Sequence, residues 1–153
     1  MTRTTMGTAI LLAFTAIPLT AQERKITAAD LPAAVRATAQ AQSQGATVRG
    51  YSREVEHGRV QYEVEMVIAG RSRDVTISAD GTVVEIEQQV AFDSLPAPVR
   101  TALMKKAGKG RITGVESLTK GGTLVAYEAA IVTAGKRSEV QVGPDGTALT
   151  HEE

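Results

Sequence analysis

The fold of this chain is decided by a stretch in which apolar and polar residues alternate, Val60-Gln61-Tyr62-Glu63-Val64-Glu65-Met66-Val67-Ile68. Alternation with a period of two is typical of a β-strand that buries one of its faces. A second stretch, Val125 to Thr133, occurs later in the chain and carries the same Tyr-Glu pair. The sequence therefore predicts two equivalent strands, each with one face toward a core and one toward solvent.

An internal repeat surrounds these two strands. The segment Leu31-Pro32-Ala33-Ala34-Val35-Arg36 reappears as Leu95-Pro96-Ala97-Pro98-Val99-Arg100, and Asp80-Gly81-Thr82 reappears as Asp145-Gly146-Thr147 after one inserted residue. This many matches in the same order along the chain indicate a duplicated unit. The duplication predicts that the two parts of the chain share one architecture, whatever the individual elements are. We assign repeat 1 to residues 22–89 and repeat 2 to residues 90–153.

Each repeat is expected to begin with a helix. Asp30 and Ser94 stand ahead of a Leu-Pro pair, and this pattern places a capping oxygen before a proline in the first turn. An apolar residue then recurs at every fourth position, and Gly45 and Gly108 are suitable ends. The predicted apolar stripes are Leu31, Val35 and Ala39 in repeat 1, and Leu95, Val99 and Leu103 in repeat 2.

Hairpin register predicts what these helices cover. Two-residue turns at His57-Gly58, Gly70-Arg71 and Asp80-Gly81 bring apolar residues opposite one another in repeat 1, and a slip by one residue would mix the faces. The expected pairs are Met66 with Val75, Val64 with Ile77, Ile77 with Val84, Val75 with Ile86 and Val55 with Val60 in repeat 1, and Ile131 with Val140 and Ala129 with Val142 in repeat 2. The predicted fold is α+β: two tandem repeats, each a helix followed by a four-stranded antiparallel β-meander, with the helices covering one face of a joined sheet.

The first 21 residues form a separate segment. Arg3 is their one charged residue, and the 12-residue apolar run from Met6 to Ile17 suits a signal peptide but is shorter than the roughly 20 residues that a membrane-spanning helix needs. Cleavage after Ala21 is expected. The sequence thus predicts a periplasmic or secreted protein that does not insert into the membrane once the signal is removed.

Composition excludes several classes of partner. Aromatic residues make up 3% of the chain, which leaves little material for stacking on bases or sugars, and the net charge is zero. We therefore expect no nucleic-acid partner. The absence of Cys excludes disulfides, thiol catalysis and thiolate metal sites.

No enzymatic constellation is expected. His57 precedes a glycine in a predicted turn and His151 lies close to the end of the sequence, and spacing gives neither a serine or carboxylate partner. Gly108-Lys109-Gly110-Arg111 lacks the length and the Ser or Thr of a phosphate-binding loop. We predict that the protein is not an enzyme and uses no metal or other cofactor.

The polar side of the predicted sheet is mostly acidic. It is interpreted either as a solvated face or as a binding surface for a partner with basic or donor-rich groups. Glu63, Glu65 and Asp74 are close enough together to suggest Ca²⁺, although no loop with alternating oxygen ligands is present. The candidate partner-binding residues are Glu63, Glu65, Asp74, Thr76, Glu85, Glu87, Glu128, Glu139 and Gln141.

Taken in order, these motifs resemble a known family. The leading Leu-Pro-Ala-Ala-Val-Arg, the Tyr-Glu-Val-Glu strand and the closing Val-Thr-Ile-Ser-Ala-Asp-Gly-Thr-Val look like the PepSY domain, and more closely its exported PepSY-like relatives grouped with the β-lactamase inhibitory protein. The resemblance implies helices packed on joined antiparallel sheets and a role in binding or inhibiting proteins outside the cytoplasm. PepSY units also occur in peptidase propeptides, so a peptidase is one partner class that the resemblance implies.

Two functional hypotheses follow. The first is a non-catalytic exported module that binds or inhibits another protein through the open sheet face. The second is a module that senses a small ligand or a cation for an envelope signalling system.

Overall fold

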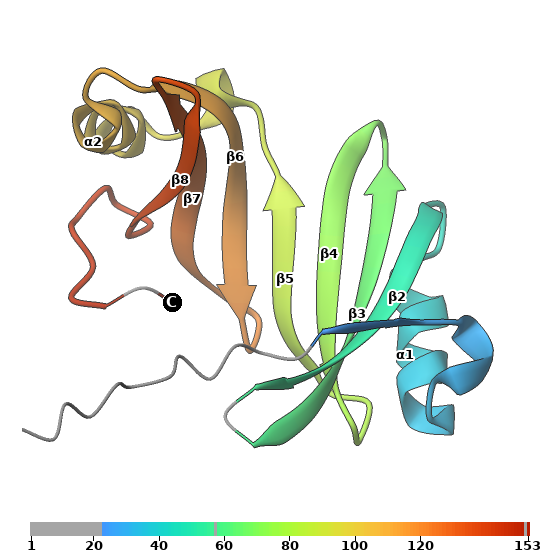
Figure 1. Ribbon diagram of the computed structural model, residues 1–153. Helices are drawn as coiled ribbons and strands as arrows, with labels where there is room; N and C mark the ends of the chain where they lie inside the picture. The colour runs from blue at the N-terminus through green and yellow to red at the C-terminus, as the bar shows by residue number, and fades with distance from the viewer. Residues whose placement is uncertain (1–22, 57, 152) are drawn as a thin grey trace, which may run out of the picture.

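The protein folds around a single antiparallel sheet (Figure 1). A computed structural model describes residues 23–56, 58–151 and 153. The sheet has eight strands in the order β1-β2-β3-β4-β5-β6-β7-β8, so each strand pairs with its neighbours in the sequence. The strands are β1 Arg24–Ile26, β2 Thr47–Glu56, β3 Arg59–Ile68, β4 Arg71–Ser78, β5 Val83–Gln89, β6 Arg111–Lys120, β7 Thr123–Thr133 and β8 Lys136–Val142.

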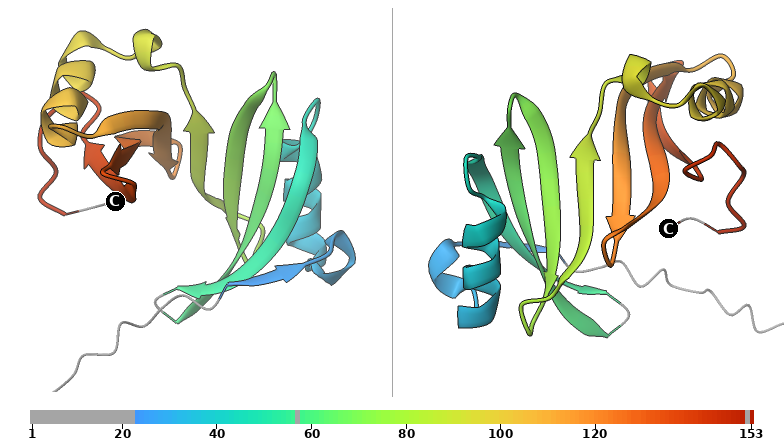
Figure 2. Two further views of the ribbon diagram at one scale, coloured as in Figure 1. Left: turned by 45° about the horizontal axis from the view of Figure 1, so that its top comes forward. Right: turned by 180° about the vertical axis from the view of Figure 1, so that it is seen from behind.

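Two helices cover the same face of this sheet. Helix α1, Ala33–Gln42, follows the short 3₁₀ helix η1, Ala28–Asp30, and helix α2, Ala97–Ala107, follows η2, Phe92–Ser94. The views in Figure 2 show α1 beside the β2–β4 half and α2 beside the β6–β8 half, with β5 between the halves.

Each helix closes its own aliphatic core. The predicted stripe residues of both helices are buried, because a spacing of four residues aligns side chains on one face of a helix. Under α1 they meet Tyr62, Val64, Met66, Val75 and Ile77, and under α2 they meet Val115, Ala129 and Val142. Burying this apolar surface is what holds the helices against the sheet.

The hairpin turns correct the expected register. Val55 does pair with Val60 and Val75 with Ile86. However, the β3–β4 turn is formed by Ala69 and Gly70, both at positive φ, and not by Gly70-Arg71. Positive φ at both central residues defines the type I′ turn whose twist matches the flanking strands.

This displacement of the turn by one residue shifts the pairing by two. Val64 therefore lies opposite Val75, Tyr62 opposite Ile77 and Met66 opposite Arg73. Ala134 and Gly135 make the same turn between β7 and β8, and there Ala129 pairs with Val140 and Tyr127 with Val142. A shift of two preserves which side chains face the core, so the predicted faces persist although the predicted partners were wrong.

The turn after β4 also differs from the prediction. Ser78 N–H donates to Thr82 O at 2.9 Å, so the loop holds three residues, 79–81, with Gly81 at φ +90. A three-residue loop that ends on a left-handed glycine introduces a bulge. Ile77 consequently pairs with Val83 and not with Val84.

The predicted arrangement of two units, each a helix followed by four strands, is wrong. In the second half only β6, β7 and β8 follow the helix, and the described residues after Val142 contain no further strand. The reason is composition: Leu149 is the one large aliphatic side chain after Thr147, whereas Val83, Val84 and Ile86 follow the matching turn of the first half.

The additional strand lies ahead of the first helix instead. Lys25 on β1 pairs with Ser52, and Gln89 on β5 pairs with Glu116, which are equivalent positions in the numbering that aligns Leu31 with Leu95. The bulge between Val48 and Gly50 on β2 likewise recurs between Ile112 and Gly114 on β6. Strand β5 thus closes the first half and also occupies, ahead of α2, the place that β1 occupies ahead of α1.

The predicted signal peptide, residues 1–21, lies outside the described residues, and so does His57. Among the residues that are described, no helix is both long enough and apolar enough to cross a membrane.

Candidate binding face

The side of the sheet away from the helices, called here the open face, gathers carboxylates from neighbouring strands. Every predicted binding residue has its strand position on this face, because each alternates with core residues such as Val64, Val75 and Ala129. The register places them in rows across the strands: Glu63, Thr76 and Glu85; Glu65, Asp74 and Glu87; Glu128 and Gln141; and Glu139 opposite Ala130.

The second of these rows is a carboxylate ladder. Glu65 on β3 lies directly opposite Asp74 on β4, which lies directly opposite Glu87 on β5. Like charges at directly opposed positions destabilise a sheet. Lys25 bonds to the Glu65 end of the ladder through its Nζ, while Asp74 and Glu87 lie further inside the face.

Burial and mutual repulsion raise the proton affinity of this ladder. The pKa of Asp74 rises to about 6, first because burial penalises the charged form and then because the Glu63 and Glu116 carboxylates are near. The pKa of Glu87 rises to about 8 for the same first reason, with Glu85 and Glu116 as the repelling neighbours. At neutral pH the face therefore holds carboxyl groups that gain from a proton or from a cationic partner.

The carboxylates of the adjoining row, Glu63 and Glu85, each have a donor or a cation nearby. Burial raises the pKa of Glu63, but the buried Ser52 hydroxyl donates to Glu63 Oε2 at 3.1 Å and partly offsets that rise. Glu85 Oε2 lies 3.4 Å from Lys120 Nζ on β6. This row therefore has a hydroxyl donor at Glu63 and an ammonium group at Glu85.

These rows border a groove of about 560 Å³. Sequence reasoning identified Glu63, Thr76, Glu85 and Glu87 in its lining but missed Glu54, Glu56, Lys120, His151 and Glu153; Gln61 lines it as well. Glu54 pairs with Gln61 on β3, so the Val55–Val60 pairing predicted from the sequence already placed it on this face. Lys120 was missed because the turn around Lys120-Gly121-Gly122 has no unique register in the sequence.

A second polar cluster lies on the β7–β8 side of the open face. Gln141 Nε2 donates to Glu128 Oε2 at 2.7 Å, and Gln141 Oε1 accepts from the backbone N–H of Glu153 at 2.8 Å. Gln141 is buried. Glu128 and Gln141 are therefore engaged with each other and with the end of the described chain, whereas Glu139 on β8 is exposed.

One group of carboxylates has spacing suited to a metal cation, but a lysine ammonium group already lies among these carboxylates. Ligand oxygens of Glu23, Glu63 and Glu65 lie within 4.8 Å of one another. Lys25 Nζ bonds to Glu65 and lies 3.1 Å from Glu23 Oε1, so its ammonium group supplies the positive charge. Asp74, which the sequence grouped with Glu63 and Glu65 as possible calcium ligands, is outside this group.

His151 has the environment of a surface residue. Its Nδ1 lies 3.1 Å from Thr150 Oγ1 and its Nε2 lies 3.9 Å from Glu153 Oε1, and its side chain is largely exposed. These neighbours are those of a surface histidine and do not form a nucleophile with an activating base.

Comparison with known proteins identifies the fold. No family model matches the chain, and no curated protein matches it. A BLIP-like protein from Bacteroides fragilis is similar in structure, with a TM-score of 0.58 and 20% identity over 80% of this chain and 85% of that one. An inferred periplasmic protein from Bacteroides eggerthii has a TM-score of 0.64 and 16% identity over 78% and 86% of the two chains.

A DUF2874 family protein from Bacteroides ovatus is similar as well, with a TM-score of 0.62 and 16% identity over 78% of this chain and 85% of that one. At these identities the comparisons show the fold alone. The chain has a BLIP-like fold.

Proposed function

We propose that this chain is an exported, non-catalytic binding module of the PepSY-like type, and that it engages a protein partner through the open face. The carboxylate ladder of Glu65, Asp74 and Glu87 carries this proposal. A fold gains nothing from opposing carboxylates at half-buried positions, so their presence is best explained by a partner that supplies the missing positive charge.

The ladder also defines the chemistry of the partner. A protein segment with Lys or Arg side chains would place cationic donors against Asp74 and Glu87, which are strong acceptors when ionised. The BLIP-like fold supports this proposal, since one face of the sheet is left without helices. The signal-like residues 1–21 and the similarity to the inferred periplasmic protein support an exported location.

The test is affinity capture from envelope extract by the immobilised protein. The test variant carries Glu65→Gln, Asp74→Asn and Glu87→Gln, which remove charge with little change in shape. The control variant carries Asp80→Asn, Asp93→Asn and Asp145→Asn, which remove the same formal charge at exposed positions in turns and in η2.

The expected result is a partner that the parent and the control retain, that the ladder variant loses, and that salt elutes. Hydrogen exchange in the purified complex should then show protection on β3, β4 and β5. Equal retention of that partner by the ladder variant would overturn the proposal.

A further inference from the structure

The outer edge of β8 is a strand edge without a partner strand. Strand β8 is the last in the order of the sheet, and among the described residues after it there is no further strand. In the first half the equivalent strand β4, which follows the same kind of turn, pairs on this edge with β5. The repeated unit therefore accepts an antiparallel strand at this edge, and β8 presents the same edge to solvent.

Hairpin geometry determines which backbone groups of β8 face outward. The two residues that flank the two-residue turn form a hydrogen-bonded pair, and such pairs alternate along an antiparallel ladder. Arg137 and Glu139 lie in the intervening pairs, so their N–H and C=O groups point away from β7. Ala130, which lies opposite Glu139, agrees with this orientation, because its carbonyl accepts from Thr113 Oγ1 on β6 at 3.2 Å. Arg137 and Glu139 thus offer free backbone donors and acceptors at the edge.

The open part of this edge is the first part of β8. Residues 136–139 are exposed, whereas Gln141 and Val142 are buried. Val142 belongs to the core under α2, and Gln141 Oε1 accepts from the backbone N–H of Glu153. The described end of the chain therefore lies beside the last part of β8, and an added strand has room only before it.

The charges on this part of β8 complement those of a second copy. Arg137 and Glu139 are two residues apart, so both lie on the open face. In an antiparallel pair centred on Ser138, Arg137 of each copy lies opposite Glu139 of the other, and opposed unlike charges stabilise a sheet. A shift of the centre by one residue would set outward backbone groups against inward ones. A centre at Glu139 or at Arg137 would instead oppose two like charges, so one register is favoured.

We propose that two copies of this chain join through β8, antiparallel and related by a two-fold axis at Ser138. Arg137 of each copy exchanges both of its backbone hydrogen bonds with Glu139 of the other, so the two sheets continue into one. Helix α2 covers the part of β8 that contains Val140 and Val142. The α2 helices of the two copies therefore lie on opposite sides of the axis.

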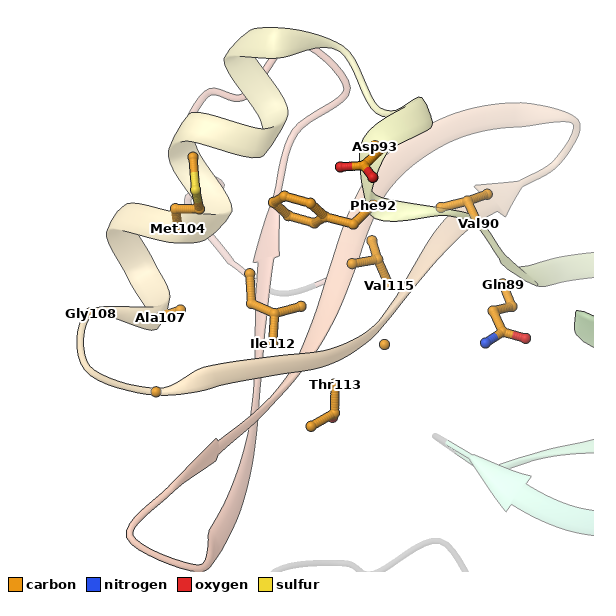
Figure 3. A pocket seen from close by; sticks show the side chains of 12 residues that line it. Gln89, Val90, Phe92, Asp93, Met104, Ala107, Gly108, Ile112, Thr113 and Val115 are labelled. Atoms are coloured by element: carbon orange, nitrogen blue, oxygen red, sulfur yellow. The ribbon is translucent and has the colours of Figure 1, made fainter.

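This association rests on backbone bonds and charge, and not on burial of apolar surface. In the described part of the chain, Met104 is the one large hydrophobic side chain that is exposed, at 53%. It borders a cavity of about 700 Å³ beneath α2, which Phe92 and Ile112 also line and to which β8 contributes no residue (Figure 3). The dimer is therefore expected to be weak and to dissociate as salt is added.

The test is sedimentation equilibrium at low ionic strength, with protein from about 10 μM to about 1 mM. The parent should form a dimer. Arg137→Glu and Glu139→Arg should each weaken it roughly tenfold, because each creates two opposed pairs of like charge. A variant that carries both changes should dimerise like the parent. An equimolar mixture of the two single variants should form a mixed dimer, since every carboxylate then faces a guanidinium group.

A single cysteine reports the register, because the chain contains no other. Ser138→Cys places two sulfurs at directly opposed positions, within the span of a disulfide. Lys136→Cys, on the same face of the same strand, sets each cysteine opposite Val140 of the other copy. The Ser138→Cys variant should therefore form a covalent dimer on mild oxidation, whereas the Lys136→Cys variant should stay reduced.

The charge control is Arg71→Glu, at the exposed position that follows the equivalent turn of the first half, and it should associate like the parent. A parent that stays monomeric at the highest concentration, single variants that dimerise as well as the parent, or equal oxidation of the two cysteine variants would overturn the proposal. Protection of the β8 amides only in a complex with another protein would also overturn it, since the edge would then take a foreign strand.

Discussion

Asp74 on β4 lies directly opposite Glu87 on β5, and both carboxyl groups are half-buried. Their pKa values rise to about 6 and about 8, so the folded state holds protons that the unfolded chain has released. The stability that such groups contribute is complete below the unfolded pKa near 4 and is lost as the pH rises through the folded values.

Acidification from pH 8 to pH 5 should therefore raise the melting temperature, measured by calorimetry at constant ionic strength. Asp30, Asp80 and Asp145 act in the opposite direction, because hydrogen bonds from Thr27, Ser78 and Thr147 lower their pKa values. Their contribution is lost only below about pH 4. A melting temperature that falls steadily from pH 8 to pH 5 would contradict this assignment.

Removing one charge from the ladder should reproduce part of this effect at fixed pH. Glu87→Gln should raise the melting temperature at pH 8 and flatten its pH dependence between pH 6 and pH 8, since the repulsion from Glu85 and Glu116 disappears. Glu139→Gln, at an exposed position of the edge strand β8, is the matched control and should leave the pH profile unchanged. If the two variants gave the same profile, Glu87 would not be the titrating group.

Truncation should destabilise the protein strongly at one methionine and hardly at all at another. Met66 is 1% exposed under α1, so Met66→Ala should lower the free energy of unfolding by about 2–5 kcal/mol. Met104 is 53% exposed, so Met104→Ala should change it by no more than about 0.5 kcal/mol. Denaturant titrations of both variants measure the difference, and a large loss for Met104→Ala would mean that this residue holds α2 in place.

Gly146 should tolerate substitution less well than Gly122. Both have φ near +80, so alanine at either position costs about 1–2 kcal/mol in backbone strain. At Gly146 the new Cβ would also lie 2.6 Å from Pro98 O at the start of α2, whereas at Gly122 nothing lies within 4 Å. Gly146→Ala should therefore destabilise the protein by about 1–3 kcal/mol more than Gly122→Ala in the same denaturant assay.

Periodicity and turn geometry encode different parts of this fold. The helix stripes and the sides of the strands were predictable, because the spacing of residues such as Val35 or Val64 reports a face directly. The exact partners across the β3–β4 turn were not, since Ala69 adopts a positive φ, which is uncommon for alanine. Strand β1 was missed because its three residues, Arg24–Ile26, are too few to show a period.

The open face was likewise predictable in part. Its acidic character was visible in the alternation of β3, β4 and β5, but the contribution of Glu116 depends on β5 pairing with β6 across the two halves. No local pattern encodes a pairing between segments that a helix separates in the sequence. The cavity that Phe92, Met104 and Ile112 line could not be predicted from the sequence either, because these residues come together only after the chain has folded.

Strand β5 belongs to both halves of the hydrogen-bonded sheet, since it pairs with β4 on one edge and with β6 on the other. Ile86 on β5 packs against the core under α1, and Val90, directly after the strand, packs against the core under α2. Neither half could be excised with its backbone bonds complete, since either cut would expose an unpaired strand edge to other chains. Loss of one half on heating should destabilise the other, so the protein is expected to melt as one cooperative body.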